Sequence, residues 1–172
     1  MKLTVRLFIQ KHENRTYTVT VPVLANISAY GPTLEECKEE IAQALVKRLS
    51  EMPADYLNHV ALRPNQSLEK VTVELRPTDQ KGKRRREALK LTVSFILTPE
   101  EEGQILVSAP RLDSPSLSFF IAKRSELNEV AQLELAQYFH EFSFEQLLLY
   151  RAARYETLDT LEVEFKDRKS VV

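Results

Sequence analysis

Two residue types that build many functional sites, cysteine and glycine, are scarce in this chain of 172 residues. Its one cysteine, Cys37, cannot form an internal disulfide, which fits a reducing compartment. Its three glycines, Gly31, Gly82 and Gly103, stand far apart and cannot form a glycine-rich phosphate loop of the Gly-x-x-x-x-Gly-Lys type. The sequence therefore predicts neither a disulfide scaffold nor that kind of nucleotide site, and it predicts no cofactor.

Neither a strong net charge nor a long apolar run is present. The formal net charge is -1 at pH 7 and the pI is about 6.3, so no whole-molecule field attracts nucleic acid or anionic lipid. No window approaches the roughly 18 apolar residues of a membrane-spanning helix. The opening run Met1–Ile9 is interrupted by charge and lacks a cleavage site of small residues. We therefore expect a cytoplasmic protein with no membrane contact.

Chemistry-bearing side chains do not gather along the chain. The histidines His12, His59 and His140 are scattered, and His140 has no second histidine at the spacing of a zinc site. Cys37 falls near an expected helix start, which could lower the pKa of a thiol, but it also belongs to an apolar stripe, which favours a buried small hydrophobe. The sequence predicts no catalytic, cofactor-binding or metal-ligating residue, and therefore predicts that the chain is not an enzyme.

An internal repeat organises the chain. Three apolar segments of the first half recur in the second half, and the pairs are Leu3–Val5 with Leu91–Val93, Val19–Leu24 with Val107–Leu112, and Val71–Leu75 with Leu161–Phe165. The first two pairs share an offset of 88 residues (91 − 3 and 107 − 19), and the third has an offset of 90 (161 − 71). A shared offset preserves register across a whole hairpin, and the slip of two indicates a short insertion in the middle of the repeated unit. We interpret the chain as a duplication.

Each copy begins with two predicted strands. Apolar residues alternate along them, which places one face of each strand in a core. Lys11–Arg15 is the turn between the first two strands, and Pro99–Gly103 is its counterpart in the second copy. Because proline lacks the N–H that a strand ladder needs, Pro22 and Pro110 are predicted to end the second strand of each copy.

A long amphipathic helix follows in each copy. Thr33 is the predicted N-cap of the first, Glu36 completes a Thr-x-x-Glu capping box, and Gly31 is expected to relieve the backbone where the preceding strand turns. The apolar stripe of this helix is Leu34, Cys37, Ile41, Leu45, Leu49 and Met52. Ser125 is the predicted cap of the second helix, where aromatic residues favour a bulkier core over a ligand pocket. Its stripe is Leu127, Ala131, Leu135, Tyr138, Phe139 and Phe142.

A short helix is predicted after each long one. It covers about Pro53–Val60 in the first copy, and in the second it runs from a capping box at Ser143 to about Ala152. A short third strand is expected before the long helix, at 26–30 in the first copy, and a final strand closes each copy.

These elements define the predicted architecture. It is an α+β fold of two tandem strand-strand-(strand)-helix-short helix-strand repeats, with each helix packed on a mainly antiparallel sheet. The predicted domains are a first repeat at 1–80 and a second, divergent repeat at 89–172. A basic linker at 81–88 is predicted to join them.

The first repeat carries a family resemblance. Tyr17–Leu24 followed by Ser28–Cys37 resembles the HicB-like antitoxin family, which places a strand ending in Pro-x-Leu before an aromatic-Gly-x-Thr-Leu-Glu-Glu turn and a helix. The resemblance covers about residues 3–50 and extends to the second copy by shape. It implies a HicB-like fold and, as one function, neutralisation of a small RNA-cleaving toxin. The opening Lys2–Val5 is similar to the variable N-terminal regions of some bacterial Clp-type AAA+ unfoldases.

One basic run lies between the copies. Its consecutive cations, which are of the kind that contact RNA or DNA phosphates, are Lys83, Arg84, Arg85 and Arg86. Its position beside Pro77, without interleaved aromatic residues that could stack on bases, favours a solvated linker. Nucleic acid is therefore not the expected partner. We expect a non-catalytic module that binds a protein partner or another domain of its own polypeptide. Its expected role is that of the N-terminal recognition or regulatory domain of a larger bacterial AAA+ ATPase or unfoldase. The alternative is a HicB-like antitoxin, and the sequence leaves the oligomeric state open.

Overall fold

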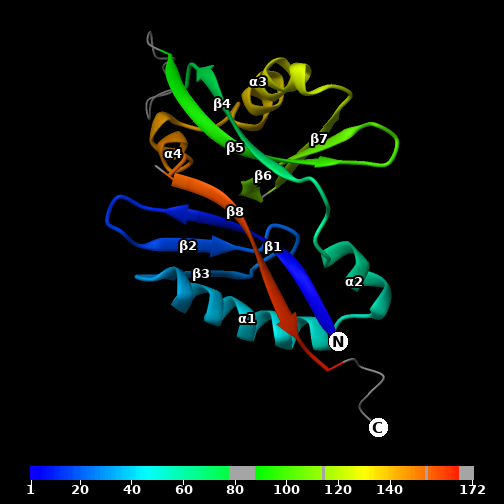
Figure 1. Cartoon of the computed structure of the whole chain (residues 1–172). Coiled ribbons are helices and arrows are strands. Elements are labelled where there is room, and N and C mark those ends of the chain that lie inside the picture. The colour runs from blue at the N-terminus through cyan, green and yellow to red at the C-terminus, as the bar shows by residue number, and fades with distance from the viewer. Residues whose placement is uncertain (78–87, 114, 154, 167–172) are drawn as a thin grey trace. The chain divides into compact units, whose positions relative to one another are not determined.

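The computed structural model describes residues 1–77, 88–113, 115–153 and 155–166, and it shows an α+β fold with two antiparallel sheets of four strands (Figure 1). The predicted order of elements is confirmed, and it occurs twice. The first half contains β1 Lys2–Lys11, β2 Tyr17–Thr20, β3 Ser28–Gly31, α1 Leu34–Ser50, α2 Ala54–Val60 and β4 Ser67–Leu75. The second half contains β5 Leu89–Pro99, β6 Ile105–Asp113, β7 Ser116–Ile121, the 3-10 turn η1 Arg124–Glu126, α3 Leu127–Tyr138, α4 Phe144–Leu148 and β8 Tyr155–Glu164.

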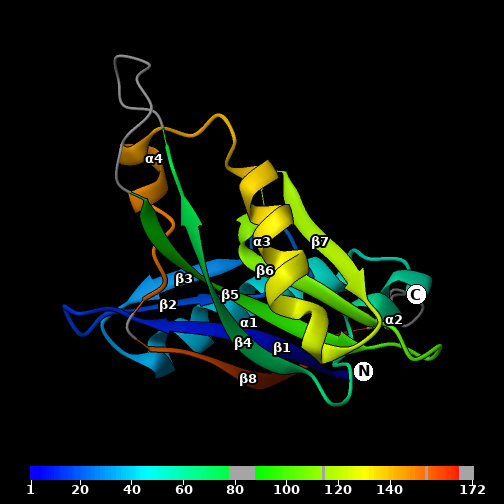
Figure 2. The same cartoon turned by 90° about the horizontal axis from the view of Figure 1, so that it is seen from above.

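The chain divides into two compact units. Unit 1 comprises the described residues of Met1–Arg63 and Ala153–Val172, and unit 2 comprises those of Pro64–Ala152. The sheet of unit 1 has the strand order β3-β2-β1-β8, and the sheet of unit 2 has the order β4-β5-β6-β7. Within unit 1, α1 packs against β2, β3 and β8. Within unit 2, α3 packs against β4 and β7, and Figure 2 shows it running alongside β7.

The last strand of each repeat lies in the sheet that the other repeat begins. β4 pairs antiparallel with β5, and β8 pairs antiparallel with β1, beside which it runs in Figure 1. The units therefore do not follow the predicted boundaries of 1–80 and 89–172. Pairing β4 with the next strand closes only the short connection from Leu75 to Leu89, which costs less chain entropy than a return to β1. β8 occupies the remaining position beside β1.

The strand registers repeat with the offsets read from the sequence. In the β1–β2 ladder Phe8 faces Thr20, and in the β5–β6 ladder Ile96 faces Ser108, so both partners differ by 88 residues (96 − 8 and 108 − 20). All four residue pairs of these two ladders follow the same rule. The first hairpins of the two repeats therefore have the same strand register.

The offset becomes 90 within β6. Thr20 faces Ser28 across β2 and β3, whereas Ser108 faces Ser118 across β6 and β7, so two more residues separate the partners in the second repeat. The register of β6 with β7 shifts between Ser108 and Asp113. Pro110 lies inside this irregular stretch, so the prediction that it ends the second strand is wrong. A bulge tolerates proline because the missing N–H is not needed there.

The entry into the long helix differs between the repeats. Thr33 Oγ1 accepts the Glu36 N–H at 3.2 Å, which confirms Thr33 as the N-cap of α1. Ser125 does not cap α3, contrary to the prediction, because it lies within η1 and the helix begins at Leu127. The Glu126 carboxylate instead reaches back to the Ala122 N–H at 3.1 Å.

The structure does not require glycine at position 31, contrary to the prediction. The φ of Gly31 lies outside the left-handed region, so the strand does not need glycine to turn there. A Cβ on Gly31 would lie 3.4 Å from Cys37 Sγ, which is an ordinary van der Waals contact, so the packing of β3 against α1 does not require glycine either. The short helix α4 carries the full Ser143–Gln146 capping box, with bonds of 2.8 and 3.3 Å, but it ends at Leu148 and not near Ala152.

The predicted apolar stripes form the two cores. The buried helical side chains in unit 1 are Cys37, Ile41, Leu45 and Leu49, and those at the equivalent positions in unit 2, each 90 residues later, are Leu127, Ala131, Leu135 and Phe139. In the described part of the chain, no helix is long and apolar enough to cross a membrane.

Candidate functional site

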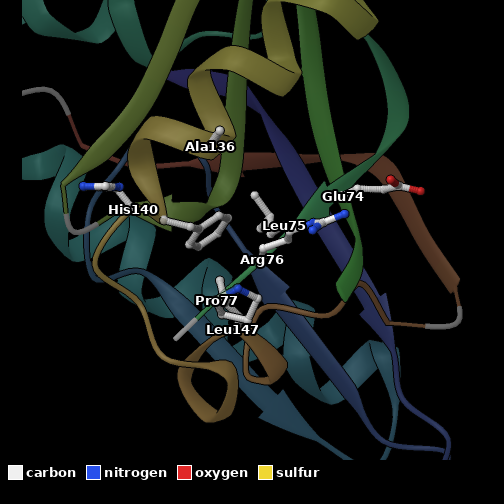
Figure 3. A pocket seen from close by; sticks show the side chains of 8 residues that line it. Glu74, Leu75, Arg76, Pro77, Ala136, His140 and Leu147 are labelled. Carbon is white, nitrogen blue, oxygen red and sulfur yellow. The ribbon is translucent and has the colours of Figure 1, made fainter. Parts of the chain in front are cut away.

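A pocket of about 270 Å³ lies in unit 2, where the end of β4 meets the α3–α4 region (Figure 3). Its lining residues are Glu74, Leu75, Arg76, Pro77, Ala136, Phe139, His140 and Leu147. The first four come from the first repeat and the others from the second. The pocket therefore exists only because β4 pairs with β5.

Core side chains lie beneath the pocket, but its exposed lining is more polar than apolar, and its rim carries charged groups. Leu75, Phe139 and Leu147 belong to the core of unit 2 and are 9%, 4% and 1% exposed. Alternation along β4 turns Leu75 inward and leaves Glu74 on the opposite face of the strand. In Figure 3 the side chains of Glu74 and His140 point away from each other, on opposite sides of the pocket.

The charged and polar groups at the rim are Glu74, Arg76 and His140, and all three are exposed. Glu74 Oε1 lies 4.0 Å from Lys90 Nζ on the neighbouring strand, and both side chains are well exposed. Arg76 follows the end of β4 and is exposed, as is His140 after the end of α3. The rim can therefore present donors from Arg76 and His140 above the core side chains of unit 2.

Phe139, which lines the pocket, belongs to a cluster of aromatic side chains. Phe139 contacts the rings of Tyr138 and Phe142 at 5.1 Å and that of Tyr150 at 5.3 Å between centroids. Tyr138 also donates from its hydroxyl to the Pro115 carbonyl at 2.9 Å. The aromatic stripe thus thickens the core of unit 2, as predicted, and one of its rings also lines the pocket.

A second cluster of polar side chains lies at the β1–β2 turn of unit 1. His12 Nε2 and Thr18 Oγ1 are 2.7 Å apart, and the rings of His12 and Tyr30 are 6.2 Å apart. Hydrogen bonds with the side chains of Thr16 and, to a lesser extent, Asn14 lower the pKa of Tyr30. These groups are exposed or half-buried, and their contacts stabilise the hairpin tip.

Metal-ligating groups do not converge in the described part of the chain, and its one cysteine is buried. No three His, Cys, Asp or Glu side chains among those residues could hold a metal ion together. Cys37 is 1% exposed, and burial, with smaller contributions from Glu40 and Glu36, raises the pKa of its thiol. The prediction of a buried small hydrophobe at this position is confirmed. Burial keeps the thiol protonated and inaccessible.

The predicted nucleic-acid residues Lys83, Arg84, Arg85 and Arg86 lie outside the described residues, as does the predicted linker except Ala88. Sequence reasoning missed the pocket because half of its lining was assigned to a different domain. The available signal was the aromatic stripe of the second helix, which marked one wall. The other wall could be found only from the strand pairing.

Comparison of the chain with protein-family models, with curated proteins and with solved structures found no match to any of them.

Proposed function

We propose that this chain is a non-catalytic protein-binding module and that the pocket of unit 2 anchors an apolar side chain of its partner. The observation that carries the proposal is a pocket with a mainly polar lining, including Arg76 and His140 at its rim, that reaches down to the core side chains Leu75, Phe139 and Leu147. The volume of about 270 Å³ is just below the range of small-molecule and cofactor sites. It suits one or two side chains, as in the hot-spot pockets of protein interfaces.

The exposed face of α3 supports the same proposal. Leu133 is 69% exposed and lies one helical turn before Ala136, which lines the pocket. A partner segment seated in the pocket can thus continue over an apolar side chain on the helix. Arg76 and His140 favour an acidic residue next to the apolar anchor, because both present donors. The occupant we propose is a peptide segment that combines these two features.

Selection from a displayed library of random twelve-residue peptides tests this proposal with the full-length chain. We expect enrichment of peptides in which a large apolar residue adjoins Asp or Glu. Ala136→Arg should abolish their binding by filling the pocket with a long cationic side chain. Val46→Arg is the matched control, because Val46 is the equivalent exposed position on α1, 90 residues earlier, and this variant should bind normally.

The outcome can contradict the proposal in two ways. Selected peptides that bind Ala136→Arg as well as the unmodified chain would place recognition elsewhere. Equal loss in both variants would point to a general effect of the added charge. Circular dichroism of each variant establishes that the fold is retained.

The wider role we propose is that of a cytoplasmic recognition or regulatory domain at the N-terminus of a larger bacterial AAA+ ATPase or unfoldase. The alternative role is that of an antitoxin. It is supported by the Tyr30–Cys37 segment, which resembles the HicB-like turn and leads from β3 into the helix capped by Thr33. The downstream reading frame separates the two. An ATPase domain supports the first role, and a neighbouring gene for a small basic RNA-cleaving protein, whose toxicity this chain relieves on co-expression, supports the second.

A further inference from the structure

β1 presents one edge to a strand from the other repeat along its entire length. The β1–β8 ladder runs without interruption from Lys2 facing Glu164 to Lys11 facing Tyr155. We infer that this edge, with its counterpart on β5, makes the two halves of the chain obligate partners. Residues 1–80 and 89–172 form one complex even when no peptide bond joins them, because each half supplies the last strand of the sheet that the other begins.

The apolar fit of β8 to unit 1 supports this inference. Val163 and Phe165 are 4% and 5% exposed and belong to the core that α1 covers. The ladder is prolonged beyond the strand ends: the Phe165 N–H donates to the Met1 carbonyl, and the Met1 amino group donates to the Phe165 carbonyl, both at 2.9 Å. Without β8, this side of the core of unit 1 would be open to water and the edge of β1 unpaired.

The charges on the strands favour the exchanged partner over the repeat's own strand. Arg6 of β1 faces Thr160 of β8. If the first repeat kept its own last strand in the equivalent register, Arg6 would face Lys70 (160 − 90), and like charges directly opposite each other destabilise a strand pair. In the observed pairing Lys70 faces Ser94 of β5. The exchange of strands thus keeps Arg6 and Lys70 apart, whereas pairing of β1 with β4 would place them opposite each other.

Ion pairs also join the two halves. Lys38 Nζ of α1 lies 2.6 Å from Asp159 Oδ2 of β8. Arg124 Nη1 of η1 lies 2.8 Å from Glu69 Oε1 of β4. The two acids are equivalent positions of the exchanged strands (159 − 69 = 90), although their cations come from different positions in the repeat.

Cutting the full-length chain between the repeats tests the inference. Lys81–Arg86 is replaced by the recognition sequence of a site-specific protease, and the cut protein is passed through a size-exclusion column in native buffer. We expect both fragments to elute together at the volume of the uncut protein and to separate only in denaturant. Elution as two separate species in native buffer would overturn the inference.

A cross-link identifies the strands that hold the fragments together. In a Cys37→Ala background, Thr4→Cys with Glu162→Cys places two thiols at facing positions of β1 and β8. Facing residues of antiparallel strands have Cα separations of about 4.5–5.5 Å, which a disulfide can span. After oxidation and cutting, we expect the two fragments to migrate as one covalent species until a reductant is added.

The matched control is Thr4→Cys with Thr72→Cys. Thr72 is the position that would face Thr4 if the first repeat kept its own last strand (162 − 90), and in the structure it faces Thr92 instead. We expect no disulfide between Thr4→Cys and Thr72→Cys. A disulfide within the 1–80 fragment, or the lack of one in the Thr4→Cys with Glu162→Cys variant, would overturn the exchange even if the fragments elute together.

Discussion

Units 1 and 2 bury side chains at equivalent positions but distribute the core volume differently. Ile41 of α1 corresponds to the smaller Ala131 of α3, whereas Leu49 corresponds to the larger Phe139. α1 has 17 residues, and α3 has 12 and leads into the aromatic cluster, of which Phe139 lines the pocket. The comparison teaches that the backbone plan determines which positions are buried, while their occupants can trade volume with one another as long as the total is kept.

A fully buried helical position that holds leucine in both units offers the strongest test of this equivalence. Leu45→Ala in unit 1 and Leu135→Ala in unit 2 each remove a side chain that is 0% exposed. Each should lower the free energy of unfolding by about 2–5 kcal/mol, measured by urea denaturation, because a cavity remains in a packed core. A loss below about 1 kcal/mol in either unit would show that its core is loosely packed and that the equivalence fails there.

The helix entries should respond unequally. Thr33→Ala removes the side-chain acceptor of the Glu36 N–H and should cost about 1 kcal/mol of stability in thermal or chemical denaturation. Ser125→Ala, at the cap position predicted from sequence, should change stability by no more than about 0.5 kcal/mol, because Ser125 lies in η1 and caps no helix. Equal losses of stability in the two variants would contradict the conclusion that Thr33 caps a helix and Ser125 does not.

The first turns share their hydrogen bonds but not their backbone strain. The Arg15 N–H donates to the His12 carbonyl at 3.0 Å, and the Gly103 N–H donates to the Glu100 carbonyl at 3.3 Å. Both residues have positive φ, 65° for Arg15 and 79° for Gly103, a conformation that only glycine adopts without cost. Arg15→Gly should therefore stabilise the protein and Gly103→Ala destabilise it, each by up to about 1 kcal/mol in chemical denaturation. The same sign for both variants would contradict this account.

The smallest expected effect concerns the ion pair of unit 1. The hydrogen bond from Lys38, opposed by partial burial and assisted by the Thr160 N–H, lowers the pKa of Asp159. The pair's contribution to stability is therefore present above the ordinary carboxylate pKa and is lost as the pH falls through the lowered value. Lys38→Met should cost less than about 1 kcal/mol at neutral pH, and denaturation curves at decreasing pH should show that cost vanishing in acid. A cost independent of pH would assign the effect to packing.

The exposed pair of unit 2 provides the control for that measurement. Lys90 and Glu74 are 4.0 Å apart and their side chains are 73% and 65% exposed. Water screens such a pair, so Lys90→Met should leave stability unchanged at any pH. A pH-dependent loss in this variant would mean that the acid response is not specific to Asp159.

Local patterns predicted most of the elements. Alternation located the strands, and the helical stripes identified the residues that α1 and α3 bury. The cap at Thr33 followed from its spacing to Glu36. The same reasoning failed at Pro110, which lies in the irregular stretch where the second repeat has two extra residues. It also failed at Ser125, which lies in a 3-10 turn that precedes the helix.

The sequence by itself determined the repeat, the α+β class and the buried face of each element, because these depend on the spacing of apolar residues and on turn chemistry within a few positions. Only the tertiary structure decided which strand completes which sheet. β4 and β8 have the same apolar pattern, so either could pair with β1 by periodicity alone, and connection length and the charges opposite Arg6 select β8. The pocket depends on that choice, since Glu74–Pro77 reach Phe139 and Leu147 only through the pairing of β4 with β5.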